Sequence, residues 1–191
     1  MKKIIIVVFL AFSINSYSQV VDSMKNYEII DSSLNLSINY SEKWREQKTN
    51  QSTKSSNDQN KYIPVIHIES NPNNQTELNS VPSVVTALIV TRDSSYDVKT
   101  VTDESKYLDQ VKLEMLQLYG HLQFEDEINT TIIDNKQLRS LKASVQTMGY
   151  IFYQEYITFL FDKNYITFVL LYTQKDERDE LISLISFIEN E

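Results

Sequence analysis

The chain has 191 residues, 41% of them hydrophobic, and a formal net charge of −8. One hydrophobic core commonly serves roughly 100–200 residues, so the length predicts a single domain, and the hydrophobic content excludes global disorder. Two glycines and no cysteine exclude glycine-rich nucleotide loops, disulfides, zinc-thiolate sites, thiol nucleophiles and lipidated cysteines. Nucleic acid is a poor partner for such an acidic chain, because a phosphate backbone requires a basic face.

The N-terminus has the layout of a secretory signal peptide. Lys2 and Lys3 precede an unbroken apolar run over residues 4–12, and small serines follow it. That run is shorter than the about 20 residues that a membrane span requires. We predict cleavage between Ser18 and Gln19, which leaves a mature chain of net charge −10 without a lipoprotein cysteine. The sequence thus predicts a soluble protein in the periplasm or outside the cell; an uncleaved anchoring helix is the alternative.

Three strands are predicted in the first half of the mature chain. Residues 34–40 alternate apolar and polar side chains, which predicts a half-buried strand. Residues 45–60 contain no apolar side chain and predict a long, disordered polar loop. A second strand is predicted over residues 62–68. Residues 84–90 are continuously apolar, which predicts a third strand covered on both faces.

A mid-chain helix is predicted over residues 104–119. Thr102 and Asp103 are both suitable N-caps, and Gly120 suits the position just after the helix. Apolar residues recur at steps of three and four, so they share one face that is predicted to be buried: Leu108, Val111, Met115 and Leu118.

The rest of the chain predicts an antiparallel meander and a last helix. Strands are expected at residues 128–133, 138–147, 150–161 and 165–172. Asp134-Asn135-Lys136, Met148-Gly149 and Asp162-Lys163-Asn164 have the composition of tight turns. The terminal helix is predicted over residues 176–189, with an apolar stripe of Leu181, Ile182, Ile185 and Ile188.

This order of elements predicts an α+β fold, because strands and helices are segregated rather than alternating. An antiparallel sheet has two faces to cover, and two helices are available. We therefore expect an α-β-α sandwich over residues 19–191, with a central antiparallel sheet, one mid-chain helix and one C-terminal helix.

The pattern resembles the PsbP/DcrB-like superfamily. An alternating strand runs into Trp44, although the family usually has a proline where Ser41 stands. A single long helix follows the third strand. A strand, tight turn and strand follow at residues 132–138, where Asn135 takes the place of the family's frequent glycine. The last helix ends near Ser186-Phe187.

The resemblance covers nearly all of the mature chain and implies the same α-β-α sandwich. Its members are mainly small accessory or binding proteins, among them photosystem assembly factors and secretion chaperones. No catalytic residues are common to them, so the resemblance implies no catalytic site and no cofactor.

Few side chains in the sequence suggest a catalytic or metal-binding role. His67 lies between two isoleucines of a strand, and His121 follows Gly120; a terminal or edge position explains each better than a metal does. Glu125-Asp126-Glu127 is an acidic cluster that lacks the spacing and glycine of a calcium loop, which favours a solvated loop. We predict no catalytic, cofactor-binding or metal-binding residue.

Aromatic residues are concentrated in the hairpin over residues 150–172, on both faces of its strands. A central hairpin covered on both sides explains them best, and an apolar groove or interface is the functional alternative. The two residues that we predict to contact a partner are Trp44 and Tyr153.

The leading functional hypothesis is an exported, non-enzymatic accessory protein that acts through protein contacts. The alternative is an envelope enzyme that binds a small ligand or metal through His121 or the acidic cluster. A structural envelope component that works as an oligomer is a third hypothesis.

Overall fold

The computed structural model describes residues 25–47, 63–70, 86–93, 103–147 and 149–188. The predicted signal peptide and its cleavage site at Ser18 and Gln19 lie outside the described residues, as does most of the predicted polar loop. Within the described ranges, no helix is both long enough and apolar enough to cross a membrane.

The larger of two sheets has eight strands, and every neighbouring pair is antiparallel. In spatial order its main path contains β3 (Trp44–Glu46), β4 (Ile63–Ser70), β5 (Ala87–Asp93), β10 (Asn164–Tyr172), β9 (Tyr150–Phe161), β8 (Lys136–Thr147) and β6 (Gln123–Phe124). A further strand, β7 (Asn129–Ile133), also pairs with β8. The aromatic β9–β10 hairpin is thus central, as predicted.

The smaller sheet has three antiparallel strands in the order β1 (Asn26–Asp31), β2 (Leu36–Ser41) and β11 (Ile185–Phe187). It joins the two ends of the described chain, because β2 pairs with β1 on one side and with the C-terminal β11 on the other. A second sheet was not predicted from the sequence.

Within the part of the chain that the structure describes, two helices accompany the sheets, α1 (Glu104–Leu118) and α2 (Lys175–Ser183). Asp103 caps α1 as predicted, and its side chain accepts a hydrogen bond from the backbone N–H of Ser105 at 2.8 Å. Gly120 follows α1 at the expected place but does not adopt a left-handed conformation; the N–H of Tyr119 donates to the Met115 carbonyl at 2.7 Å.

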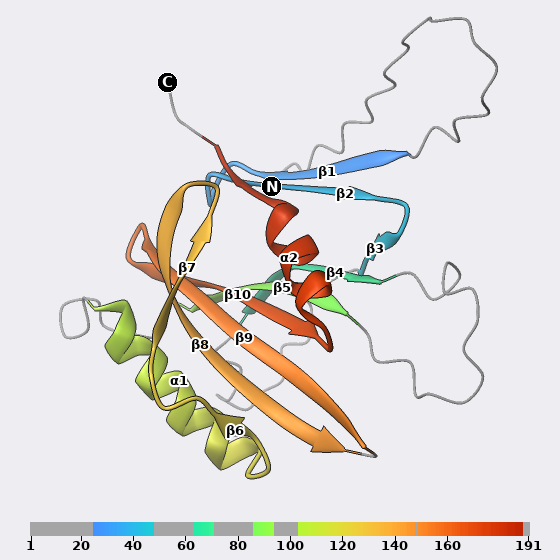
Figure 1. The fold of residues 1–191 in the computed structure, drawn as a ribbon. Helices are drawn as coiled ribbons and strands as arrows, with labels where there is room; N and C mark the ends of the chain where they lie inside the picture. The colour runs from blue at the N-terminus through green and yellow to red at the C-terminus, as the bar shows by residue number, and fades with distance from the viewer. Residues whose placement is uncertain (1–24, 48–62, 71–85, 94–102, 148, 189–191) are drawn as a thin grey trace, which may run out of the picture.

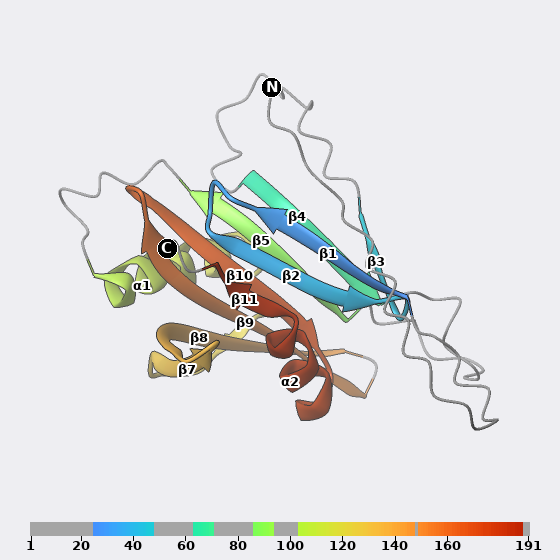
Figure 2. The same ribbon diagram turned by 90° about the horizontal axis from the view of Figure 1, so that it is seen from above.

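The predicted sandwich is corrected on one side. A core that contains Tyr107, Leu108 and Val111 packs α1 against one face of the large sheet. The other face is covered by the small sheet together with α2, and not by a helix alone. Figures 1 and 2 show α1 on one side of the large sheet, with β1, β2, β11 and α2 on the other. The fold is α+β as predicted, but its layers are a helix, a large sheet, and a small sheet with a short helix.

The predicted terminal helix over residues 176–189 is also corrected. The helix α2 ends at Ser183, and the chain continues as β11. The N–H of Asn39 donates to the Leu184 carbonyl at 2.8 Å, and Ile185 pairs with Ile38 of β2. A free strand edge in β2 therefore competes successfully with the helical spacing of the C-terminal apolar residues.

The tight turns of the meander are confirmed. Asp134 and Asn135 have φ angles of 47° and 62°, and Asp162 and Lys163 have φ angles of 44° and 61°. These left-handed pairs are typical of two-residue hairpin loops, whose twist matches that of the strands. Gly149, at φ 84°, lies in the third predicted turn. The start of the predicted polar loop is wrong, because its residues 45 and 46 belong to β3.

Candidate functional site

Two cavities lie on opposite faces of the central strand β9. Successive side chains of a strand point to opposite faces, so odd-numbered residues of β9 face α2 and even-numbered residues face α1. Tyr153 and Glu155 line the first cavity, whereas Gln154 and Tyr156 line the second. The first is polar and is the candidate functional site.

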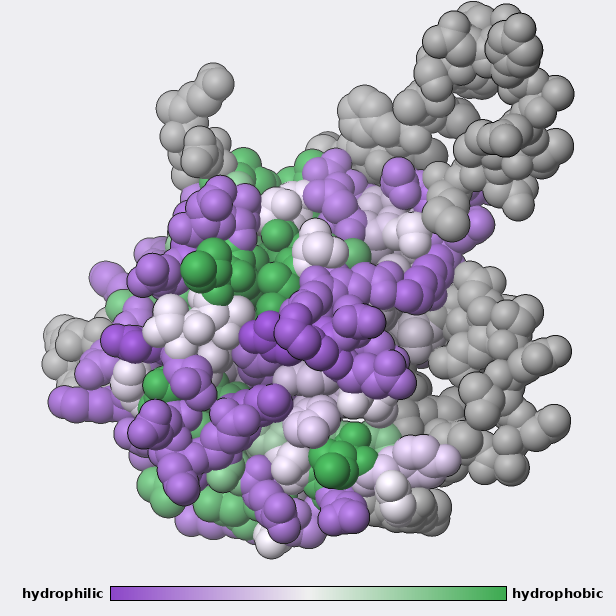
Figure 3. Space-filling view, viewed as in Figure 1, coloured by the Kyte–Doolittle hydropathy of each residue, from purple (hydrophilic) through white to green (hydrophobic). Residues whose placement is uncertain are grey.

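The polar cavity has a volume of about 590 Å³, within the range of about 300–1,000 Å³ that small-molecule sites occupy. It opens between α2 and the strands β7, β8 and β9. Figure 3 shows hydrophilic surface across the middle of this side of the molecule. The residues that line it are Glu125, Asn129, Thr130, Thr131, Ser140, Lys142, Tyr153, Glu155, Tyr172, Thr173, Lys175 and Arg178.

An ion pair between buried Glu155 and partly exposed Arg178 forms the floor of the polar cavity. Glu155 is 3% exposed at the centre of β9, and Arg178 reaches it from α2. The Arg178 Nε atom lies 2.5 Å from Glu155 Oε2, and Nη2 lies 2.7 Å from Oε1. This two-pronged geometry is the strongest that arginine and a carboxylate form, and it fixes the orientation of both planes.

Hydroxyl groups complete the coordination of Glu155. Thr131 donates to Oε1 at 3.0 Å and Tyr172 donates to Oε2 at 3.2 Å, so both carboxylate oxygens carry two hydrogen bonds. Burial and the negative charge of Glu155 raise the pKa of Tyr172, while hydrogen bonds to Glu155 raise the pKa of Arg178. At neutral pH the phenol therefore keeps its proton and the guanidinium its charge.

The helix cap of α2 holds Arg178 in place. Glu177 accepts hydrogen bonds from the backbone N–H groups of Thr173 and Gln174, at 2.7 and 3.1 Å, and from the Thr173 hydroxyl at 2.8 Å. Burial alone raises the pKa of Glu177, but these hydrogen bonds outweigh it and lower that pKa below 4.5. The charged cap fixes the first turn of the helix, from which Arg178 points to β9.

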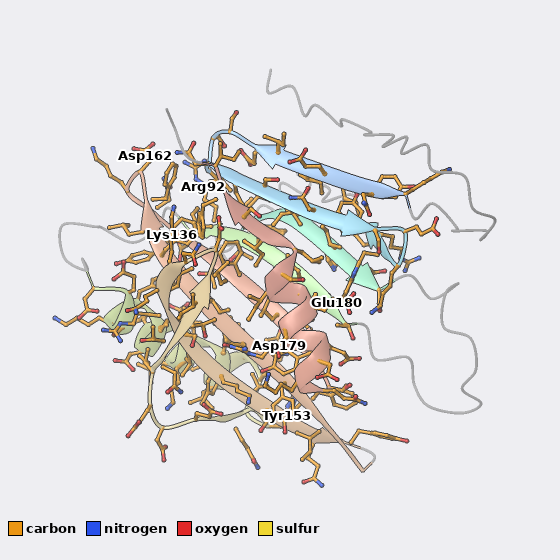
Figure 4. The ribbon with its side chains drawn as sticks, turned by 45° about the horizontal axis from the view of Figure 1, so that its top comes forward. Arg92, Lys136, Tyr153, Asp162, Asp179 and Glu180 are labelled. Carbon is orange, nitrogen blue, oxygen red and sulfur yellow. The ribbon has the colours of Figure 1, made fainter. Side chains whose placement is uncertain are left out.

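Two lysines form the rim of the polar cavity. Lys142 lies 3.7 Å from Glu125, and Lys175 pairs with Asp179, one helical turn along α2. Lys175 is largely exposed and the Lys142–Glu125 pair is partly exposed, and surface pairs contribute only about 0–1 kcal/mol. An incoming anion can therefore replace Glu125 or Asp179 at little cost. Figure 4 shows Asp179 on the side of α2 nearer to Tyr153, and Glu180 on the side nearer to β4.

Tyr153, one of the two predicted contact residues, lies in the wall of the polar cavity. Its ring stacks on Tyr172 at a centroid distance of 5.4 Å, and the Lys142 ammonium lies 4.6 Å from its centroid. The ring therefore contacts both neighbours within the cavity wall. Tyr153 shapes this wall beside Lys142, and a partner contact at this residue stays a prediction.

Trp44, the second predicted contact residue, is only 4% exposed. Its indole N–H donates to Glu180 at 3.2 Å, and Lys43 pairs with the same carboxylate at 2.5 Å. The indole therefore anchors β3 to α2, which favours a packing role for Trp44. A partner contact at this residue stays a prediction.

The two histidines are not brought together. His67 is on β4, near one edge of the large sheet, and its Nε2 lies 3.7 Å from Glu69. His121 is exposed beside β6 at the opposite edge, in edge contact with Tyr119. The metal-binding hypothesis loses its histidine pair.

The acidic cluster at residues 125–127 is engaged by neighbouring groups. Lys142 pairs with the Glu125 carboxylate, and Lys112 donates to its carbonyl at 3.0 Å. Among the residues that the structure describes, no three histidines or carboxylates gather as a metal site would require. This arrangement favours the solvated-loop interpretation of the cluster.

Sequence reasoning missed Glu155 and Arg178. One signal was present: Glu155 is the only charged residue in the twelve-residue strand β9, YIFYQEYITFLF. A charge at the centre of an otherwise apolar and aromatic strand must be paired if it is buried. No sequence pattern identifies Arg178 as its partner, because all of the first six residues of α2 are charged.

Comparison with known proteins supports the fold. No protein-family model matches the chain, and no curated protein sequence does. The solution structure of the cyanobacterial PsbP protein CyanoP from Synechocystis sp. PCC 6803 is similar at a TM-score of 0.53 and 14% identity, over 90% of this chain and 98% of that chain.

The crystal structure of LpqN, a protein of Mycobacterium tuberculosis involved in cell envelope biogenesis, matches at a TM-score of 0.42 and 10% identity. That match covers 98% of this chain and 93% of LpqN. The fold of this chain is PsbP-like, as the order of its elements predicted.

Proposed function

We propose that this chain is an exported accessory protein that acts by binding rather than catalysis, and that the polar cavity receives an anionic group of a protein partner. One observation carries the proposal. In a chain of net charge −8, Lys142 and Lys175 line one cavity whose third cation, Arg178, is already neutralised by Glu155.

The chemistry of the cavity suits recognition. The Glu155–Arg178 pair is saturated with hydrogen bonds, so it forms a rigid polar floor whose charges neutralise one another. The two lysines have weak surface partners and are free to exchange them. A carboxylate from an acidic side chain or a chain terminus would replace Glu125 or Asp179 and gain a charge-assisted hydrogen bond.

The test is a comparison of tagged baits covering residues 19–191, incubated with the native cell envelope and analysed by quantitative mass spectrometry. One bait is wild type, and one carries Lys142→Glu and Lys175→Glu. A matched control carries Lys25→Glu and Lys106→Glu, two exposed lysines away from the cavity, so that both variants have the same net charge.

We expect one protein to be enriched by the wild type and the control, and about tenfold less by the cavity variant, which corresponds to about 1.4 kcal/mol. The complex should then form again from the two purified proteins. Equal enrichment by all three baits contradicts the cavity as the site.

Failure of every bait to enrich a protein over tag alone contradicts a protein partner and favours the alternative, a small polar ligand in the same cavity. Native mass spectrometry of the mature chain purified from its own cells then detects that ligand as added mass.

A further inference from the structure

The last two turns of α1 are poorly covered, although their sequence predicts burial. Of the four residues on the predicted buried face, Leu108 and Val111 are 0% and 2% exposed. Met115 is only partly buried and Leu118 is 67% exposed. The helix is packed tightly at its start, where Tyr107 stacks on Tyr165 at 4.0 Å, and loosely at its end.

A second cavity, of about 350 Å³, explains the loose packing. We call it the apolar cavity. Its floor is formed by Ile89 of β5 and by Val169 and Leu171 of β10. Its wall is formed by residues of α1 spaced four apart: Val111, Met115 and Tyr119. Atoms that line a void lose dispersion contacts, so an apolar occupant restores them.

Two hydroxyl groups of this cavity have hydrogen-bond partners within the protein. The Tyr156 hydroxyl donates to the Gln154 side chain at 2.8 Å, and the Thr91 hydroxyl donates to the Thr167 carbonyl at 3.4 Å. Burial, followed by the nearby Tyr119, raises the pKa of Tyr156, so its phenol remains neutral. These two hydroxyls therefore need no hydrogen bond from an occupant, and no charged side chain among the described residues lines the cavity.

Size and shape narrow the class of occupant. A cavity of about 150 Å³ holds one benzene ring, so this cavity has room for roughly twice that volume. Its wall follows α1 from Val111 to Tyr119, a length of about 12 Å at 1.5 Å per residue. An uncharged space that is lined mainly by apolar side chains and follows the helix in this way suits a hydrocarbon chain better than a compact polar metabolite. Tyr119 and Leu118, 50% and 67% exposed, give the end of the helix an apolar surface.

We propose that the apolar cavity binds one hydrocarbon chain, such as the acyl chain of a fatty acid or lipid. The site is separate from the polar cavity, because the two open on opposite faces of β9. The proposed hydrocarbon binding can therefore be tested independently of the proposed protein partner.

The test uses the purified chain over residues 19–191 and the fluorescent probe N-phenyl-1-naphthylamine, which brightens in apolar surroundings. Decan-1-ol and decanoic acid are the competitors, each kept below the concentration at which it aggregates. Val169→Phe fills the floor of the cavity, and Ile89→Phe is a second filling variant. Leu113→Phe is the matched control, because Leu113 is 57% exposed on α1 and does not line the cavity.

We expect both competitors to displace the probe from the wild type and from Leu113→Phe. The filling variants should bind the probe about tenfold more weakly, which corresponds to about 1.4 kcal/mol. Circular dichroism and a thermal melt establish that each variant is folded, and a filling variant that fits should melt no lower than the wild type.

The proposal is wrong if the wild-type chain does not raise the fluorescence of the probe, or if neither decan-1-ol nor decanoic acid displaces the probe. It is also wrong if folded filling variants bind the probe as well as the wild type does. Displacement by decanoic acid but not by decan-1-ol also contradicts it, because binding would then depend on a charged head and not on the chain.

Discussion

The two faces of the central strand β9 are packed in opposite ways. On the odd face, Glu155 is buried and tied to Arg178, Thr131 and Tyr172 by directed hydrogen bonds. On the even face, Tyr156 packs among apolar residues beneath α1 and leaves a void beside it. One strand thus borders two different cavities: a polar one held by paired charges, and an apolar one defined by the shape of its lining.

The energetic consequences differ as well. A buried charge is costly unless every partner is present, so the odd face tolerates little change in its floor. An incompletely packed apolar face has less to lose, since a void means that contacts are already missing. Measurements of the free energy of unfolding can therefore show which face is more sensitive to substitution.

The largest effect is expected for Arg178→Ala, which leaves Glu155 buried and unpaired. The free energy of unfolding should fall by about 3–5 kcal/mol. Urea denaturation measures it. A double variant, Arg178→Met with Glu155→Leu, should recover most of the loss, because it removes the lone charge together with its partner. A loss below about 1 kcal/mol for the single variant would mean that water reaches Glu155 freely.

Next in size is the contrast between the two halves of α1. Leu108→Ala removes a fully buried side chain and should lower the free energy of unfolding by about 2–5 kcal/mol. Met115→Ala only enlarges an existing void and should cost about 1 kcal/mol. Thermal and urea unfolding of the two variants side by side measure this difference. Equal losses would show that the apolar cavity closes in solution.

Acid should affect the odd face through the cap of α2. The pKa of Glu177 in the folded protein lies below its ordinary 4.5, so its contribution is complete above pH 4.5 and disappears as the pH falls through the lowered value. Glu177→Gln should therefore cost about 1 kcal/mol at pH 7. The gap between variant and wild type should narrow below pH 4.5. Urea unfolding at a series of pH values checks the sign, and a constant gap contradicts it.

The smallest effect is expected at the rim of the polar cavity. Lys142→Ala removes an exposed pair with Glu125 and should change the free energy of unfolding by no more than about 0.2–1 kcal/mol. Denaturation by urea measures the change. If the change is this small, a loss of binding by rim variants in the pull-down reflects the site and not unfolding. A larger loss in the free energy of unfolding would mean that Lys142 also supports the structure.

Local patterns predicted most of the fold. The meander strands, the Asp103 cap and the turn at Asp134-Asn135 are each determined by a few consecutive residues, and the structure has them. The β2–β11 half of the small sheet was missed because that pairing is non-local, whereas the local partner β1 was missed because it starts in a polar lead-in. Residues 185–187 have an apolar spacing that also fits a helix, and only contact with β2, almost 150 residues earlier in the chain, decides between strand and helix.

The polar and apolar cavities were harder to predict from the sequence than the fold was. Tyr153 was singled out for its aromatic surroundings and does line the polar cavity. The partners of Glu155 come from β7, β10 and α2, so no sequence window contains the network. The apolar cavity could not be predicted, because the spacing of Met115 and Leu118 predicts a buried face but not what lies opposite it.

The position of β2 constrains the order in which this chain can fold. Its Ile38 pairs with Ile29 on one side and with Ile185 on the other, and the Asp134 side chain accepts a hydrogen bond from the Phe187 N–H at 2.8 Å. A chain that emerges from a ribosome or a membrane pore begins at its N-terminus, so β2 exists long before β11 can reach it. Contacts between segments so distant in sequence form slowly. The β1–β2 hairpin therefore keeps one edge open until a segment almost 150 residues later in the chain has been made.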